Sequence, residues 1–208
     1  MDYKNLILRI IFSSLLISLY IVFHNNINLL LLFGLLIYFI IFYEILISFK
    51  KFKYLIIFYL ALSFFCFFIF LSLYFEFYIF NLLILIIIVF DSSSYFFGKY
   101  YGKNFPFKII SPKKSYEGYF GGILTTNFLY FLLYYKFSNY IDLYYNFYLV
   151  NSLILFSLFG DLIESYFKRV NNLKDSSKLL PGHGGFFDRF DSFISSIIFL
   201  TAYSYFYL

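Results

Sequence analysis

The sequence contains a single cysteine, Cys66, so it can form neither an intrachain disulfide nor a metal site built on a CxxC pair. Charged residues are also scarce, at 13% of a chain of 208 residues of which 62% are hydrophobic. This balance is far from that of soluble globular domains and excludes that class. We therefore expect the hydrophobic segments to lie in lipid.

The chain also lacks the signatures of soluble nucleotide-binding folds. Neither a Walker A motif nor a GxGxxG loop after a strand is present. Internal repeats, coiled-coil heptads and long linkers are absent as well. The apolar run near the N-terminus has no small-residue cleavage site, so we expect it to be a membrane anchor and not a removed signal peptide.

Long hydrophobic runs occupy most of the remaining sequence. A bilayer core about 30 Å thick needs roughly 20 apolar residues per helix, and unpaired strands or loops cannot cross it. The sequence therefore predicts an all-α, polytopic transmembrane bundle of about seven spans, at residues 6–23, 29–49, 54–74, 77–97, 119–135, 147–167 and 193–208.

The basic residues predict one orientation of these spans. If the N-terminus is cytoplasmic, only Lys136 of the sixteen Lys and Arg residues falls on the outer side. Cytoplasmic loops carry the excess of Lys and Arg in membrane proteins. We expect a multi-pass protein of the inner (plasma) membrane, with its active site facing the cytoplasm.

Two of the predicted cytoplasmic loops are richer than the outer connections. Residues 98–118 and 168–192 contain most of the glycines and all three prolines. We therefore expect N-terminal membrane helices over residues 1–76 and a membrane-embedded catalytic region over residues 77–208, with these two segments as its motif loops.

Acidic residues inside spans are costly and usually face a bundle interior or an aqueous cavity. Asp161 and Glu164 are such residues, and on a helix Asp161 shares one face with Ser165 and Lys168. Glu44 and Glu76 are each isolated near a membrane edge. For these two we expect a structural role.

The loop at residues 168–192 suits a polyphosphate ligand. Its Lys and Arg side chains offer charge-assisted hydrogen bonds, and its glycines let the backbone approach closely. Asp161, Asp188 and Asp191 are hard oxygen ligands of the kind that Mg²⁺ prefers. Zinc at His183 is disfavoured because no second His or Cys stands at ligand spacing, which leaves a phosphate contact or loop packing.

The loop at residues 98–118 repeats this chemistry with Lys113, Lys114 and Glu117 among turn-forming residues. The two lysines could simply anchor the chain at anionic lipid heads. Their neighbours Ser111 and Pro112 favour a binding loop instead.

The segment from Ser165 to Asp191 resembles the signature of the phosphatidate cytidylyltransferases, also called CDP-diglyceride synthases. Its matching residues are Ser165, Lys168, Arg169, Lys174, Asp175, Ser177, Pro181, His183, Gly184, Gly185, Asp188, Arg189 and Asp191. The earlier loop is similar to a second block of this family, through Asp91, Ser92, Tyr95, Gly98, Gly102, Ser111 to Lys114, Glu117, Gly121 and Gly122. Ser94 departs from the alanine that is usual in the family, and the chain is shorter than typical members.

The resemblance implies Mg²⁺-dependent transfer of CMP from CTP to phosphatidic acid. It implies catalytic roles for Asp161, Lys168, Asp188 and Asp191, with Asp161 and Asp188 as metal ligands. Substrate binding would fall to Ser111, Lys113, Lys114, Glu117, Ser165, Arg169, Lys174, Asp175, His183 and Arg189. The implied partners are CTP, phosphatidic acid and membrane lipids, without nucleic acid, and a homodimer is left open.

Three other functions compete with this one. A CTP-using lipid kinase of the dolichol kinase type would move the γ-phosphate to an alcohol. A CDP-alcohol phosphotransferase is disfavoured because its DGxxAR pattern is absent. A transporter with Asp161 and Glu164 at a coupling ion would be expected to show paired broken helices and an internal repeat.

Overall fold

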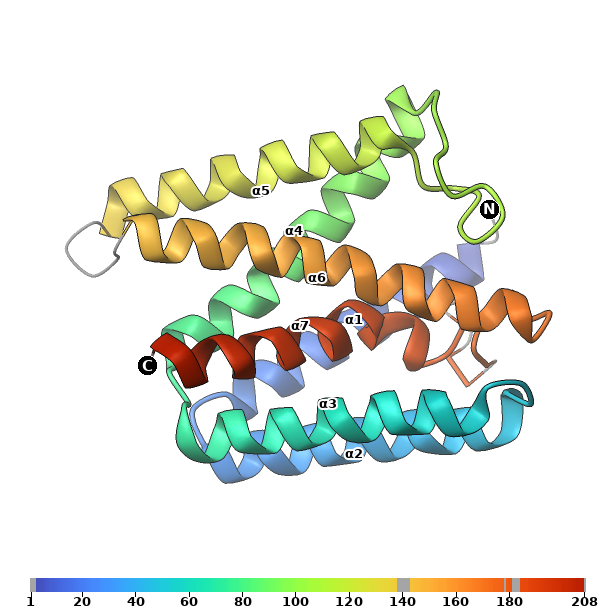
Figure 1. Ribbon diagram of the computed structural model, residues 1–208, viewed down its shortest axis with the longest axis horizontal. Coiled ribbons are helices and arrows are strands. Elements are labelled where there is room, and N and C mark those ends of the chain that lie inside the picture. Colours follow the sequence, from blue (N-terminus) through green and yellow to red (C-terminus); the bar gives the residue numbers. More distant parts are fainter. Residues whose placement is uncertain (1–2, 138–142, 178, 181–183, 208) are drawn as a thin grey trace. The chain divides into compact units, whose positions relative to one another are not determined.

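The computed structural model describes residues 3–137, 143–177, 179–180 and 184–207. In this part of the chain the regular structure is helical, apart from one bridge between Leu180 and Gly184. The seven helices are α1 (Tyr3–Phe23), α2 (Ile27–Ser48), α3 (Lys53–Leu73), α4 (Phe77–Tyr101), α5 (Tyr116–Phe137), α6 (Leu143–Val170) and α7 (Phe187–Tyr207) (Figure 1). The predicted all-α class is confirmed, with one helix for each predicted span.

Four helical segments within the described residues are long and apolar enough to cross a bilayer: α2, α3, α4 and the Phe147–Val170 part of α6. Polar residues interrupt the apolar character of α5, which contains Thr125, Thr126 and Asn127, and of α7, which begins with charged residues and contains several serines.

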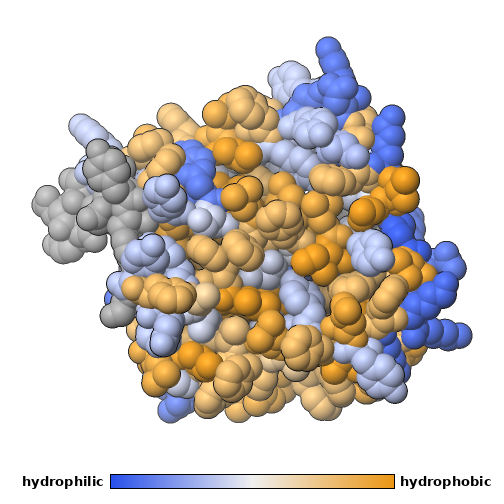
Figure 2. All heavy atoms as spheres, in the orientation of Figure 1, coloured by the Kyte–Doolittle hydropathy of each residue, from blue (hydrophilic) through white to orange (hydrophobic). Residues whose placement is uncertain are grey.

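The surface is consistent with contact with lipid. Phe39, Phe58 and Phe128 are 65%, 70% and 66% exposed, and most of the face shown in Figure 2 is hydrophobic. Apolar surface on this scale is rare on a soluble monomer. Together with the apolar helices, it indicates an integral membrane protein.

The chain forms two compact units. The first consists of Met1–Tyr74 and Phe167–Leu208, and the second is Phe75–Tyr166. The sequence predicted a different division, at residue 76, between N-terminal membrane helices and a catalytic region. That functional division stays a prediction.

In the first unit, α3 packs against both α2 and α7, and a polar link joins the three helices. Ser63 on α3 donates to the carbonyl of Ile194 on α7 at 2.9 Å. The hydroxyl of Tyr38 on α2 lies 2.6 Å from the Ser63 oxygen and, because the Ser63 proton is already used, acts as the donor. This chain of hydrogen bonds links the three helices.

Asn171, directly after α6, clamps the turn between α2 and α3. Its Oδ1 accepts from the backbone N–H groups of Lys50 and Lys51 at 2.8 and 2.7 Å. Its Nδ2 donates to the carbonyls of Lys51 and Phe167. The clamp attaches the end of α6 to the N-terminal helices.

In the second unit, α4 and α5 cross closely at glycines. A Cβ on Gly118 would lie 2.7 Å from the Ser94 carbonyl oxygen and 3.0 Å from the Cα of Gly98. Backbone atoms cannot move aside as a side chain can, so only glycine allows this approach. Farther along α5, Asn127 and Asn151 exchange two amide hydrogen bonds of 3.1 Å, which joins α5 to α6.

Candidate functional site

The predicted basic loop of the second unit forms a tight turn directly before α5. The carbonyl of Ser111 accepts from the backbone N–H of Lys114 at 3.3 Å, with Pro112 in the position that favours its fixed φ. Ser115 then caps α5, because its hydroxyl accepts from the N–H of Gly118 at 3.1 Å. Ser111 is buried, while Lys113 is exposed.

This turn brings Lys114 into contact with Asp161 of α6. The ammonium forms an ion pair with Oδ2 of Asp161, and the side chains are 28% and 19% exposed. On the same carboxylate, Oδ1 accepts from the hydroxyl of Ser165 at 3.4 Å, which confirms the predicted shared helix face. A cation therefore already stands beside the carboxylate that the sequence assigns to a metal.

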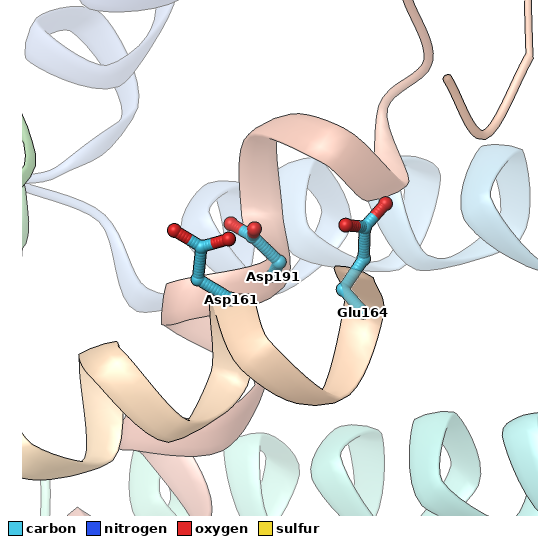
Figure 3. Close-up of side chains that lie close together, drawn as sticks. All are labelled: Asp161, Glu164 and Asp191. Atoms are coloured by element: carbon cyan, nitrogen blue, oxygen red, sulfur yellow. The ribbon is translucent and has the colours of Figure 1, made fainter. Parts of the chain in front are cut away.

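Glu164 follows Asp161 on α6. It is buried, with 1% exposure, and the carboxylate oxygens that the two residues could offer to a metal lie within 4.8 Å of each other. Figure 3 shows both side chains projecting from this stretch of the helix. Two carboxylates this close repel each other when the medium between them is apolar. A cation bound near both would relieve this repulsion.

Glu117, in the first turn of α5, holds the chain that follows α4. Its carboxylate accepts from the backbone N–H groups of Lys103 and Asn104 at 3.0 and 3.2 Å and from the Asn104 amide at 2.9 Å. These hydrogen bonds, that from Lys103 first, lower the pKa of Glu117 to about 2. Glu117 therefore shapes the predicted binding loop.

In the first unit, α6 ends directly after the predicted Lys168 and Arg169. Asn172 adopts the left-handed conformation with φ 57°, and the N–H groups of Asn172 and Leu173 bond to the carbonyls of Arg169 and Lys168. This is a Schellman motif. Arg169 also donates to the Leu173 carbonyl at 2.9 Å. The two cations thus stand where the helix dipole is negative.

Asp188, in the first turn of α7, bonds to residues of the segment that connects α6 to α7. Its Oδ1 lies 2.6 Å from the Lys168 ammonium, and the two side chains are 8% and 12% exposed. Its Oδ2 accepts from the Ser176 N–H at 2.8 Å, the Ser176 hydroxyl at 3.0 Å and the Gly185 N–H at 2.8 Å. Asp188 therefore joins the end of α6 to the start of α7.

Gly184 permits this arrangement. Gly184 has φ +83°, a conformation that side chains rarely adopt, and a Cβ there would lie 2.5 Å from the Asp188 carboxylate. The Leu180 N–H bonds to the Gly184 carbonyl at 2.9 Å. His183 and its neighbours at 181–182 lie outside the described residues.

Glu44 of α2 holds the other side of the same segment and is 1% exposed. Its Oε1 accepts from the Ser177 hydroxyl at 2.7 Å and the Phe186 N–H at 2.8 Å. Its Oε2 accepts from the Phe187 N–H at 2.9 Å and faces the Ser176 hydroxyl at 3.4 Å. Three donors thus converge on one carboxylate at the N-terminus of α7, with the Ser176 hydroxyl as a further polar neighbour.

A groove of about 640 Å³ opens beside Glu44. Its lining includes the predicted substrate-binding residues Lys174 and Asp175, together with Ser177 and the exposed ring of Tyr43. It therefore combines a cation, hydroxyl groups and an aromatic face, which are features that can bind a nucleotide.

The structure thus gathers the predicted residues into two sets. Lys114, Asp161 and Ser165 are together in the second unit, and Lys168 and Asp188 are together in the first. Arg189 and Asp191 lie on α7, where the carboxylate of Asp191 also accepts from the N–H of Ser192 at 2.7 Å. That the two sets share one metal stays a prediction from the sequence.

Sequence reasoning missed three contributors, namely the contacts of Glu44, the hydroxyl of Ser176 and the amide of Asn171. Glu44 did carry a signal, because a carboxylate within an apolar run needs compensation. Its donors lie more than 130 residues further along the chain, so spacing could not identify them.

Comparison with known proteins confirms the family that the sequence resembles. The family described as the Cytidylyltransferase family matches residues 2–207. Proteins named phosphatidate cytidylyltransferase from Staphylococcus epidermidis and Haemophilus influenzae are 42% identical over 114 residues and 40% identical over 135 residues. These matches cover 53% and 62% of this chain, but only 42% and 46% of the relatives, so the chain matches less than half of their length. Because the family match extends over nearly the whole sequence, the chain belongs to the cytidylyltransferase family.

Proposed function

We propose that this protein is a phosphatidate cytidylyltransferase. In the reaction, a phosphate oxygen of phosphatidic acid attacks the α-phosphorus of CTP. The bond from that phosphorus to the bridging oxygen of the β-phosphate breaks, which yields CDP-diacylglycerol and pyrophosphate. The observation that carries the proposal is the signature segment, in which Lys168 and Asp188 form a largely buried ion pair and Lys174 and Asp175 line a groove, in a chain of this family.

The chemistry needs little from the protein beyond charge and position. The lipid phosphate is already ionised at neutral pH, so no strong general base is required. Catalysis then depends on holding two anions in line and on stabilising the charge that moves to the leaving group. A region rich in lysines and carboxylates, of the kind found at Asp161 and Asp188, suits this task.

We assign Mg²⁺ to Asp161 and Asp188, with Asp191 beside them. The donor set fits, because all three offer hard carboxylate oxygens and the ammonium of Lys114 already pairs with Asp161. At Asp188, Oδ2 accepts from three donors and Oδ1 pairs with Lys168, so an ion held by this carboxylate would compete with these partners. When bound, the ion would neutralise phosphate charge.

The cations are assigned by position along the chain. Lys168, Arg169 and Lys174 would bind the triphosphate and the departing pyrophosphate, since Lys174 lines the groove that follows α6. Lys113, Lys114 and Arg189 would hold the lipid phosphate. In this assignment the Lys114 ammonium leaves Asp161 and turns to phosphatidic acid when both substrates bind.

We also propose the orientation that the charges favour. All seven helices cross the inner membrane, the N-terminus is cytoplasmic, and the two motif loops face the CTP pool. Fifteen of the sixteen Lys and Arg residues then lie on the cytoplasmic side.

The decisive experiment measures pyrophosphate release by the purified protein from α-³²P-labelled CTP, with and without phosphatidic acid. We expect release that requires the lipid and Mg²⁺, with the label in a lipid product. CDP and a phosphorylated lipid alcohol, without pyrophosphate, would instead identify a CTP-dependent lipid kinase and overturn the proposal.

A further inference from the structure

We infer that Glu44, in the second N-terminal helix, is a positioning residue of the reaction, because its carboxylate fixes the segment that carries Lys174, Asp175 and Asp188. The inference rests on the proposed function. It extends the active region to a helix that shows no signature motif and for which only a generic membrane role was expected.

The hydrogen bonds favour a carboxylate over an amide at this position. Glu44 meets two backbone N–H groups, from Phe186 and Phe187, and two hydroxyl groups, from Ser176 and Ser177. A hydroxyl group can rotate to become an acceptor, but a backbone N–H cannot. Since each oxygen of Glu44 receives one backbone N–H, an amide would turn its NH₂ toward a donor on one side.

The close approach of Glu44 also explains a glycine of the signature. A Cβ on Gly185 would lie 2.7 and 2.8 Å from the two Glu44 oxygens and 2.0 Å from the Ser176 hydroxyl. Any side chain at this position would push Glu44 away from the start of α7. We therefore attribute Gly185 to the close approach of Ser176 and Glu44, not to phosphate binding.

Ser176 transmits the position of Glu44 to the proposed metal ligand. Its hydroxyl lies 3.0 Å from Oδ2 of Asp188 and 3.4 Å from Oε2 of Glu44, and its N–H bonds to the same Asp188 oxygen. If Glu44 no longer holds the segment, Ser176 shifts and Asp188 loses two of its donors. The same shift would move Lys174 and Asp175, which line the groove beside Glu44.

The kinetic test compares Glu44→Gln and Glu44→Asp with two controls in the purified full-length protein. Glu76→Gln makes the same carboxylate-to-amide change at an exposed residue whose side chain makes no cap hydrogen bond. Tyr38→Phe removes the hydrogen bond to Ser63 and so destabilises the same unit away from the segment. We expect Glu44→Gln to lower kcat/KM for CTP at least tenfold, Glu44→Asp to be intermediate, and both controls to stay within twofold of wild type.

Hydrogen–deuterium exchange separates positioning from general stability. In Glu44→Gln we expect faster exchange at the amides of residues 174–177 and 184–187, with α3 unchanged. The inference would be overturned if the activity of Glu44→Gln lay within twofold of that of Glu76→Gln. It would also be overturned if amide exchange in Glu44→Gln became faster to the same extent throughout α2, α3 and α7. If the wild-type protein releases no pyrophosphate, the proposed function fails, whereas the exchange pattern still decides whether Glu44 holds the segment.

Discussion

The ammonium of Lys114, in the turn before α5, pairs with the carboxylate of Asp161 on α6. Both residues were expected at the active site from the sequence, but not as partners. The pair is only partly exposed, so its electrostatic energy is less screened than that of a surface ion pair. It places a lysine beside the carboxylate to which we assign a metal.

Removing the lysine of this pair should lower the Mg²⁺ concentration needed for activity and raise the KM for phosphatidic acid. In Lys114→Gln the ammonium no longer competes for Asp161, so we expect half-maximal activity at a lower Mg²⁺ concentration. The KM for phosphatidic acid should rise about tenfold or more, since one charge-assisted contact of roughly 1.5–3 kcal/mol is lost. Titrations of Mg²⁺ and lipid measure both. The exposed Lys108 provides the control, and a Lys108→Gln variant with the same two changes would contradict the prediction.

The largely buried pair of Lys168 and Asp188 should behave as one unit. Asp188→Asn and Lys168→Met each remove the opposite charge from a largely buried ion pair, so both single variants should lose stability and most activity. The double variant should be less destabilised than the sum of the two, with a coupling energy of about 1–3 kcal/mol. Thermal unfolding of the four proteins in the same detergent measures it. Strict additivity would show that the two charges do not interact.

Two glycines in the α4 and α5 crossing should respond differently to alanine. A Cβ on Gly118 meets backbone atoms at 2.7 and 3.0 Å, whereas a Cβ on Gly98 meets only the Ser115 hydroxyl at 3.3 Å and a backbone atom at 3.7 Å. Gly118→Ala should therefore cost about 1–3 kcal/mol through overpacking. Gly98→Ala should be near neutral, because alanine also favours the helix by up to about 1 kcal/mol. Equal shifts in melting temperature would contradict this geometry.

The lowered pKa of Glu117 predicts how its contribution to stability depends on pH. Its pKa is lowered from 4.5 to about 2 in the folded protein, chiefly by the Lys103 N–H. A lowered pKa means that the stabilising contribution is complete above pH 4.5, declines below it and is lost once the pH has fallen past about 2. The melting-temperature difference between wild type and Glu117→Gln should thus be equal at pH 7 and 5 and smaller at pH 3. A difference that grows on acidification would be incompatible with this pKa.

The proposed orientation can be tested by labelling. In a Cys66→Ser background, a cysteine at Leu179 should react with a membrane-impermeant maleimide only after the inner membrane is permeabilised. A cysteine at Asn25, between α1 and α2, should react in spheroplasts with an intact membrane. Both positions are exposed, so burial does not confound the comparison. Labelling of the Leu179 position from outside would place the signature segment away from CTP and refute the proposed reaction.

Helix positions could be predicted because a helix is stabilised by hydrogen bonds between near neighbours and by runs of apolar residues. The ends were less predictable. The predicted last span began at residue 193, whereas α7 begins at Phe187, because Glu44 accepts the N–H groups at its start. Likewise α5 begins three residues before the expected span, since Ser115 caps it.

The sequence by itself determined the helical class, the family signature and the shared face of Asp161 and Ser165, all of which depend on local spacing. Only the tertiary structure decided that Lys114 pairs with Asp161 and that Glu44 holds the segment before α7. Those partners are far apart in the chain. Their meeting depends on how whole helices pack, and the packing energy is spread over many side chains that no motif records.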